Sequence, residues 1–106
     1  MENEKIAIYC RVDEGGSEKA KEQAMQIQRF KLKQYAETNG LHISCAYEDI
    51  GHPGYEIDRP GLQKLLSDYH ADKFKYVLVT NIDRIFRGLS QKKDLFPFHI
   101  KSINSL

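Results

Sequence analysis

Tyr76-Val-Leu-Val-Thr-Asn-Ile-Asp-Arg-Ile-Phe-Arg87 is the stretch of sequence that points most directly to the fold. Residues 76–80 are aromatic, aliphatic or β-branched without polar alternation, which predicts a strand covered on both faces, as in a parallel α/β sheet. The run then changes abruptly to Asp83, Arg84 and Arg87. Open α/β sheets bind ligands beyond the carboxyl ends of their strands, and paired arginine donors suit a phosphate. The stretch therefore predicts a phosphate site; the alternative is that Asp83 caps the next helix and both arginines are solvated.

The length and charge of the chain limit what it can be. At 106 residues it is one small domain with a single core. A formal net charge of +1 gives no global argument for nucleic-acid binding, which must depend on where basic residues cluster. No apolar run is long enough to span a bilayer and no leader follows Met1, which predicts a cytoplasmic protein with no membrane partner. Cys10 and Cys45 lack CxxC spacing and are expected to be buried thiols, and no metal site is expected.

Strand-like and helix-like segments alternate along the chain. The predicted strands are 5–12, 41–47 and 76–80. The predicted helices are 17–40, 58–70 and 89–96. Ser17 and Asp58 are the expected N-caps of the first two helices, with Pro60 in the first turn of the second. This order predicts a three-layer α/β fold with a mainly parallel sheet and helices on both faces, and residues 98–106 add a short strand or stay loose.

Apolar residues at helical spacing mark the faces that the first two helices are expected to bury. In the first helix they are Ala20, Ala24, Ile27, Phe30 and Tyr35. In the second helix they are Leu62, Leu65, Leu66 and Tyr69.

Charged residues recur where the predicted strands end. Arg11 ends the first strand, Asp49 follows the second and Asp83 follows the third. Because successive crossings of a parallel sheet return to the same edge, these side chains are expected to lie near one another. Arg59, taken by itself, is more simply a loop arginine paired with Asp58 or Glu56.

Four motifs together resemble the N-terminal catalytic domain of the serine recombinases, the resolvase and invertase family. They are Ile8-Tyr-Cys-Arg-Val12, Gln28 with Tyr35-Ala36, Tyr47-Glu-Asp-Ile-Gly51 leading to Asp58-Arg-Pro-Gly-Leu62, and Val77 to Arg87. A single Asp-Arg pair would be a weak signal, but this ordered set is a strong one. The resemblance implies a resolvase-like sheet with flavodoxin-like strand order.

The resemblance also implies a chemistry. Family members attack a DNA phosphate with a serine hydroxyl, form a 5′-phosphoserine link and reseal the break with the freed 3′-hydroxyl, without a metal or another cofactor. Arginines stabilise the charge that develops on the phosphate. Carried over by motif, the residues around the phosphate would be Arg11, Arg59, Arg84 and Arg87. Asp83 would orient an arginine or assist proton transfer, with Gln28 and Asp49 in support. The implied DNA contacts are Arg59, Arg87, Lys92 and Lys93.

The chain departs from the family at the nucleophile, because Asp13 stands where the serine is expected. A carboxylate among arginines has a lowered pKa, is a poor nucleophile and repels phosphate. Asp13 is expected to fold onto Arg11, Arg59 or Arg84 and to occupy the anion site itself. Ser17 is the alternative nucleophile, although it is already explained as a helix cap. A third interpretation is a phosphoacceptor domain that uses Asp13 and Asp83.

The chain also ends before the long dimerisation helix and the DNA-binding domain that family members carry, so residues 1–106 are expected to be a truncated catalytic domain that binds DNA weakly and in a salt-sensitive way. Three origins stay open: a natural short protein, a remnant gene or a cut piece. We therefore expect an impaired DNA recombinase domain that can pair with a second copy of itself or with a full-length recombinase. The alternative is a non-catalytic interaction domain that modulates a full-length recombinase. Whether the family role is resolution, inversion or integration in a mobile element stays open.

Overall fold

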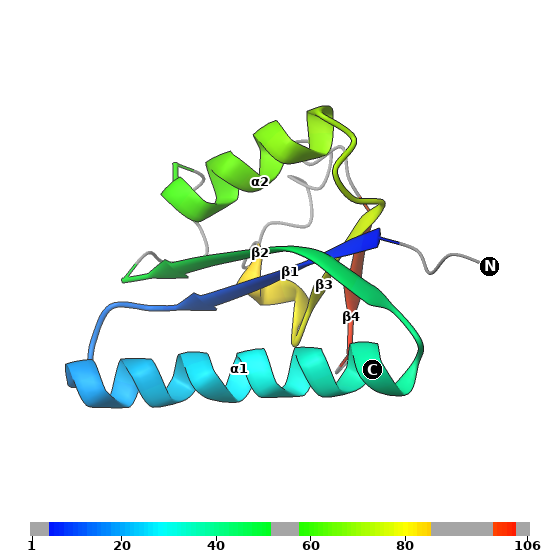
Figure 1. Cartoon of the computed structure of the whole chain (residues 1–106). Helices are drawn as coiled ribbons and strands as arrows, with labels where there is room; N and C mark the ends of the chain where they lie inside the picture. Colours follow the sequence, from blue (N-terminus) through cyan, green and yellow to red (C-terminus); the bar gives the residue numbers. More distant parts are fainter. Residues whose placement is uncertain (1–4, 52–57, 86–98, 104–106) are drawn as a thin grey trace.

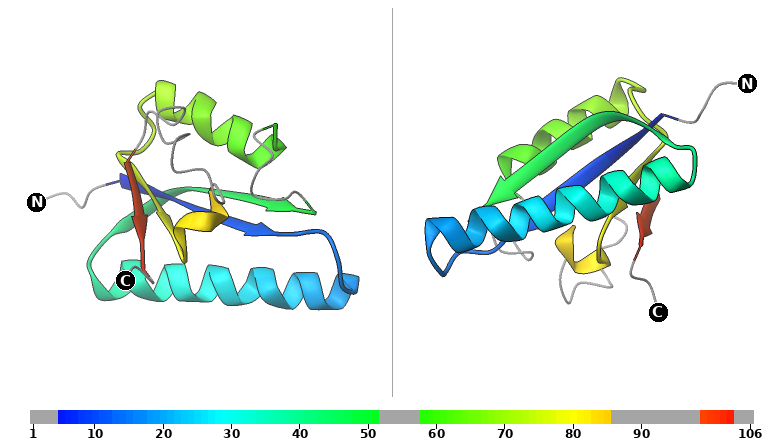
Figure 2. Two further views of the ribbon diagram at one scale, coloured as in Figure 1. Left: turned by 180° about the vertical axis from the view of Figure 1, so that it is seen from behind. Right: turned by 60° about the horizontal axis from the view of Figure 1, so that its bottom comes forward.

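A four-stranded parallel sheet lies between two helices in the computed structural model, which describes residues 5–51, 58–85 and 99–103 (Figure 1). The strands are β1 (Lys5–Val12), β2 (His42–Ile50), β3 (Tyr76–Val79) and β4 (His99–Ser102). They lie in the order β2-β1-β3-β4, and every neighbouring pair is parallel. Helix α1 (Glu18–Thr38) covers one face and α2 (Pro60–His70) the other (Figure 2). The predicted three-layer α/β class is confirmed.

Strand β1 divides its side chains strictly between the two faces of the sheet. Ile6, Ile8 and Cys10 pack in the cluster formed with α1, whereas Ala7 and Tyr9 pack in the cluster formed with α2. This is the period-two alternation of a strand, here apolar on both faces because both are covered. The lack of polar alternation in the sequence is explained by these two helical layers.

Helix α1 begins and ends as predicted but buries a different face. Ser17 is the N-cap and accepts a hydrogen bond from the Ala20 amide at 3.0 Å, and Gly40, with φ of +65°, follows the C-cap. The predicted stripe was wrong in part: Ala24 and Tyr35 pack against the core, but Ile27 and Phe30 are 54% and 65% exposed. The buried residues of α1 are Lys21, Met25, Gln28, Leu32 and Ala36. Apolar spacing missed this stripe because two of its members are polar.

Helix α2 begins at Pro60, as its sequence predicts, but Asp58 is not its cap. The N-cap position is Arg59, which makes no side-chain capping bond, and Asp58 is exposed. Leu62 and Leu65 are fully buried, and Leu66 and Tyr69 pack at the edge of the same cluster. The predicted strand 41–47 was too short, because β2 continues to Ile50 in register with the end of β1.

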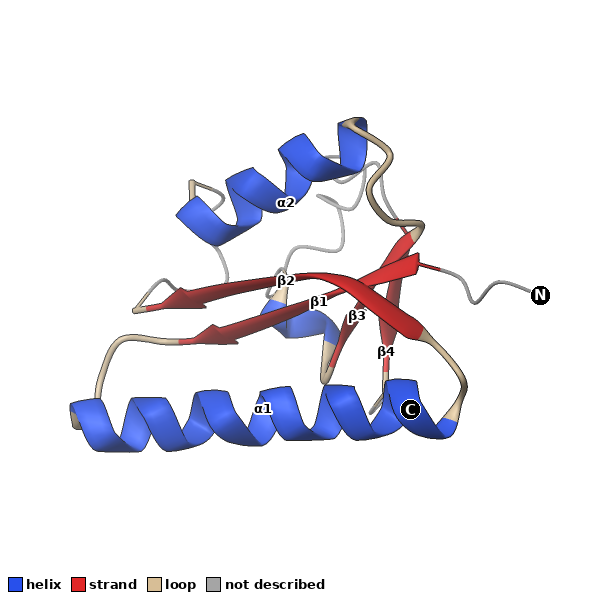
Figure 3. Ribbon diagram, in the orientation of Figure 1, coloured by secondary structure: helices blue, strands red, loops and turns tan. Residues whose placement is uncertain are grey.

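The remaining predictions fall partly outside the described residues. Strand β4 confirms the expectation of a short strand near the end of the chain, and the one-turn helix η1 (Ile82–Arg84) follows β3 (Figure 3). The predicted helix 89–96 lies outside the described residues. Cys10 and Cys45 are both free, the first buried and the second partly buried. Among the described residues, no helix has the length and apolar character needed to cross a membrane.

Candidate phosphate-binding site

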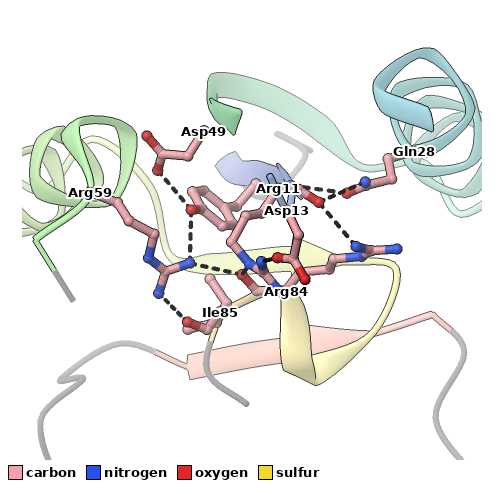
Figure 4. Close-up of polar contacts among 8 residues, drawn as sticks. Arg11, Asp13, Gln28, Asp49, Arg59, Arg84 and Ile85 are labelled. Atoms are coloured by element: carbon pink, nitrogen blue, oxygen red, sulfur yellow. Dashed lines mark hydrogen bonds and ion pairs between the residues drawn. The ribbon is translucent and has the colours of Figure 1, made fainter. Parts of the chain in front are cut away.

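The carboxyl ends of β1 and β3 lie side by side at the centre of the sheet, where the strand order reverses direction. After β1 the chain crosses to β2 on one side, and β3 and β4 lie on the other. In open α/β sheets the crevice at such a reversal is the usual ligand site. Three of the predicted arginines, Arg11, Arg59 and Arg84, meet at this position (Figure 4).

Arg11 and Arg84 are joined by two hydrogen bonds, each from the side chain of one residue to the main-chain carbonyl of the other. The Arg11 Nε donates to the Arg84 carbonyl at 2.9 Å, and the Arg84 Nη1 donates to the Arg11 carbonyl at 3.0 Å. Arg11 is fully buried although it carries a permanent charge. The exchange therefore ties the end of β1 to η1, 73 residues away in sequence.

Arg59 is also fully buried and reaches the same turn from the start of α2. Its Nη1 donates to the Arg84 carbonyl at 3.0 Å and to the Tyr9 hydroxyl at 3.0 Å, and its Nη2 donates to the Ile85 carbonyl. Two guanidinium groups thus converge on the Arg84 carbonyl oxygen. In this arrangement main-chain carbonyl oxygens accept the hydrogen bonds that the guanidinium groups would otherwise donate to an anion.

Asp49 supplies the cap that α2 lacks in its own sequence neighbourhood. Its carboxylate, on a residue only 4% exposed, accepts from the amides of Gly61 at 2.7 Å and Leu62 at 3.0 Å. It also accepts from the Tyr9 hydroxyl at 2.7 Å. Helix N-termini carry unpaired amides and partial positive charge, so a buried carboxylate is well placed there. Asp49 therefore holds α2, and Arg59 at its start, against the sheet.

Gly61 permits this close approach. A Cβ atom at this position would lie 2.5 Å from the Glu48 carbonyl oxygen and 2.8 Å from Asp49 Oδ2. These atoms belong to the strand and to the cap, so neither can move aside cheaply. In the Arg-Pro-Gly sequence, Pro60 therefore starts the helix and Gly61 makes room for the Asp49 cap, while Arg59 belongs to the site.

Gln28 connects α1 to the end of β1. Its side-chain oxygen accepts from the Arg11 amide at 3.1 Å and its amide nitrogen donates to the Arg11 carbonyl at 2.9 Å. The residue is 4% exposed. Gln28 therefore satisfies both main-chain groups of Arg11 from the α1 side, while Asp49 and Arg59 act from the α2 side.

The candidate nucleophiles lie in different surroundings. Asp13 Oδ1 forms an ion pair with Arg11 Nη1, and its side chain is 35% exposed. The Ser17 hydroxyl accepts the N-cap bond of α1. Burial raises the pKa of the Cys10 thiol to about 12, and the Glu48 carboxylate adds to the rise, so Cys10 stays protonated and unreactive at neutral pH. Of the two candidates from the sequence, Asp13 contacts an arginine of the site, Arg11, and Ser17 caps α1.

Other predicted site residues are placed only in part. Asp83 lies within η1, and its side chain is not among those described. Arg87, Lys92 and Lys93 lie outside the described residues. Their predicted roles toward a phosphate or DNA stay predictions, as do those of Arg11, Arg59, Arg84, Gln28 and Asp49.

Tyr9 belongs to the site and was missed by the sequence reasoning. Its hydroxyl lies between Asp49, to which it donates, and Arg59, from which it accepts. Burial raises its pKa above the ordinary tyrosine value, and the hydrogen bond to Asp49 adds to the rise, so the hydroxyl keeps its proton. The available signal was register, because Tyr9 precedes Arg11 by two residues and therefore faces the same side of the sheet.

Replacing Tyr9 with phenylalanine is expected to lower the free energy of unfolding by about 1–3 kcal/mol, because it removes two buried hydrogen bonds to charged partners. The measurement is urea denaturation followed by far-UV circular dichroism. Tyr35→Phe is the matched control, since Tyr35 is only partly buried on α1. An equal loss in both variants would show that the Tyr9 hydroxyl has no special role.

The chain is similar to a known protein family and to several solved structures. The model of the Resolvase, N terminal domain family matches residues 6–97. The N-terminal catalytic domain of TP901-1 integrase is 34% identical, with a TM-score of 0.78 over 94% of this chain and 77% of that one. The C-terminal catalytic domain of ISC1926 TnpA, an IS607-like serine recombinase, is 28% identical, with a TM-score of 0.79 over 95% of this chain and 68% of that one. A serine recombinase from Sulfolobus solfataricus shares the fold. It is 21% identical, with a TM-score of 0.71 over 99% of this chain and 71% of that one. No curated protein matches the chain.

Proposed function

Because the chain belongs to the resolvase N-terminal domain family, whose solved relatives include serine recombinases, we propose that it is a DNA strand-exchange domain disarmed at its nucleophile. It retains the surroundings of a phosphate site. In this proposal Arg11, Arg59 and Arg84, with Arg87, receive a DNA phosphate, and Asp13 prevents the transfer step. Asp83 orients an arginine or carries a proton, and the partner is DNA.

The ion pair between Asp13 and Arg11 is the observation that carries the proposal. Arg11 is fully buried, so its charge needs an anionic or dipolar partner, and Asp13 supplies one from within the chain. A phosphate that entered beside Arg11 would have to displace this carboxylate or accept its repulsion. Asp13 therefore acts as an internal substitute for the ligand.

Replacing Asp13 with asparagine is expected to tighten binding of a short DNA duplex several-fold at low salt, because one negative charge leaves the site while the shape is kept. The gain should shrink as salt is raised, since screening weakens the removed repulsion. Fluorescence anisotropy with labelled duplex is the measurement. The control is Asp72→Asn, which makes the same charge change at the exposed turn after α2. Equal gains in both variants would mean that the change in affinity comes from net charge alone, which would contradict the proposal.

Wild-type protein is expected to leave no covalent adduct with nicked DNA on a denaturing gel. An adduct with the wild type would mean that another group attacks, and its loss on Ser17→Ala would identify Ser17. Either result would contradict the proposed disarmed site.

A second candidate function is a non-catalytic interaction domain that modulates a full-length recombinase. The observation in its favour is the exposure of Ile27 and Phe30 on α1, at 54% and 65%. Large apolar side chains on one helix face are common features of protein contacts, although a single pair of them is also ordinary surface. Co-purification with a recombinase from the same source, lost on a joint Ile27→Ser and Phe30→Ser exchange, would support this function.

A further inference from the structure

A pocket lies on the α1 side of the site, between that helix and the turn that follows β3, and the apolar Ala24 and Ile27 line it along with polar and charged residues. It has a volume of about 220 Å³, several times the roughly 30 Å³ that one water occupies. Two cations line it, Lys31 on α1 and Arg84 on η1, together with the side chains of Gln28, Thr80 and Asn81. Among the residues whose side chains the structure describes, no acidic residue lines it. The pocket is therefore suited to an anion.

Thr80 provides an independent sign of a ligand. The residue is 3% exposed, and its hydroxyl has no hydrogen-bond partner among the described residues. Leu78 packs in the cluster formed with α1. Thr80 follows it by two residues and therefore faces the same side of the sheet, where an apolar valine would have extended the core. A buried hydroxyl without a partner is costly, and native structures seldom keep one without a reason.

Arg84 adds a second unpaired donor to the same pocket. Its Nη1 is used by the Arg11 carbonyl, but its Nε is buried and has no partner in the described part of the chain. The guanidinium group lies toward Gln28 and α1, on the opposite side from Arg59 (Figure 4). The Arg84 side chain therefore contacts the main chain of Arg11 on one side and lines the pocket with Lys31 on the other.

The outer wall of the pocket is formed by exposed side chains. Ile27 and Lys31 are exposed on α1, one helical turn apart. Their side chains can turn outward, whereas the floor is formed by the end of β3. An anion can therefore approach the two unpaired donors from the solvent side.

From this geometry we infer that the pocket formed by Lys31, Thr80, Asn81 and Arg84 binds a second backbone phosphodiester of DNA, next to the phosphate received beside Arg11. The inference rests on the proposed function, since it names a further part of the same DNA-binding edge. Two adjacent phosphate positions that share Arg84 would align the DNA backbone across the ends of β3 and β1. Lys31 would contribute charge, and Thr80 would contribute a hydroxyl donor.

Lys31→Gln is expected to weaken binding of a short labelled DNA duplex several-fold and to lower the slope of log affinity against log salt by about 0.9, the effect of losing one phosphate contact. Thr80→Val, which keeps the shape and removes the hydroxyl, should weaken binding less and leave that slope unchanged. The matched control is Lys33→Gln. Lys33 lies about 200° around the helix from Lys31 and lines a different surface hollow with Phe30 and Glu37, so its replacement should leave the slope near the wild-type value.

A second measurement separates this inference from the proposed function. Inorganic phosphate is titrated into the isotope-labelled chain of residues 1–106, and the amide signals of Thr80, Asn81 and Lys31 are followed by NMR. Shifts at these amides in the wild type, reduced in Lys31→Gln, together with the loss of DNA affinity, would support the inference. DNA binding that responds equally to Lys31→Gln and Lys33→Gln would overturn it and leave the proposed function standing. Phosphate shifts without any effect of Lys31→Gln on DNA binding would also overturn it, with a free anion as the ligand. Absence of DNA binding by the wild type would contradict both.

Discussion

Replacing Asp13 with serine is expected to produce a covalent protein-DNA adduct where the wild type gives none. The exchange removes the carboxylate that pairs with Arg11 and places a hydroxyl at the same point, directly after β1. The serine hydroxyl would give up its proton and its oxygen would form a bond to phosphorus, while the bond to the 3′-oxygen breaks and that oxygen takes up a proton, so that no net proton is gained or lost. Loss of a nucleophile costs on the order of 10⁶ in rate in a well-studied serine enzyme, so even partial restoration is measurable against a blank background.

The assay uses nicked duplexes at high protein concentration, with the adduct resolved on a denaturing gel. Asp13→Ala is the matched control, because it also frees Arg11 but offers no hydroxyl, and it should give no adduct. In the Asp13→Ser background, Ser17→Ala should leave the adduct in place, since Ser17 serves as the cap of α1. If Asp13→Ser and Asp13→Ala behave alike, the site lacks the geometry for phosphoryl transfer and the proposed function loses its main support.

Replacing Asp49 with alanine is expected to reduce the free energy of unfolding by about 3–5 kcal/mol, the cost of breaking a buried, charge-assisted set of hydrogen bonds. Three donors lose their partner at once, namely the amides of Gly61 and Leu62 and the hydroxyl of Tyr9. A small domain has only about 5–15 kcal/mol in total, so the variant should be close to unfolding. Urea denaturation should show a midpoint lowered by roughly 2 M.

Asp58→Ala is the control for Asp49→Ala, because Asp58 is the residue that the local sequence offers as the cap. Asp58 is exposed and lies one residue before the observed N-cap, so its replacement should change stability by no more than about 0.5 kcal/mol. Asp49→Asn, which keeps one acceptor oxygen, should fall between the two. A larger loss for Asp58→Ala than for Asp49→Ala would show that the capping scheme is wrong.

The missed α1 stripe and the missed α2 cap have one physical cause. Both depend on contacts between residues that are distant along the chain. Gln28 is buried because it satisfies the main chain of Arg11, 17 residues earlier, and Asp49 caps a helix whose first bonded amide is 12 residues later. Patterns within one segment favour the locally plausible answer, which was Ile27 and Phe30 for the stripe and Asp58 for the cap.

Local chemistry by itself determined the element types and the edge at which the arginines gather. The segments 6–10 and 76–79 show no polar alternation, which predicts cover on both faces, and parallel crossings return each strand end to the same side. The sequence predicted that Asp13 would pair with Arg11, Arg59 or Arg84, and tertiary structure decided that its partner is Arg11. Tertiary structure alone decided the main-chain and Tyr9 partners: Arg11 donates to the Arg84 carbonyl, and Arg59 donates to Tyr9 and to the carbonyls of Arg84 and Ile85. The reason is that hydrogen bonding of a buried charge depends on which groups the fold brings within about 3 Å, and spacing along the chain does not record that distance.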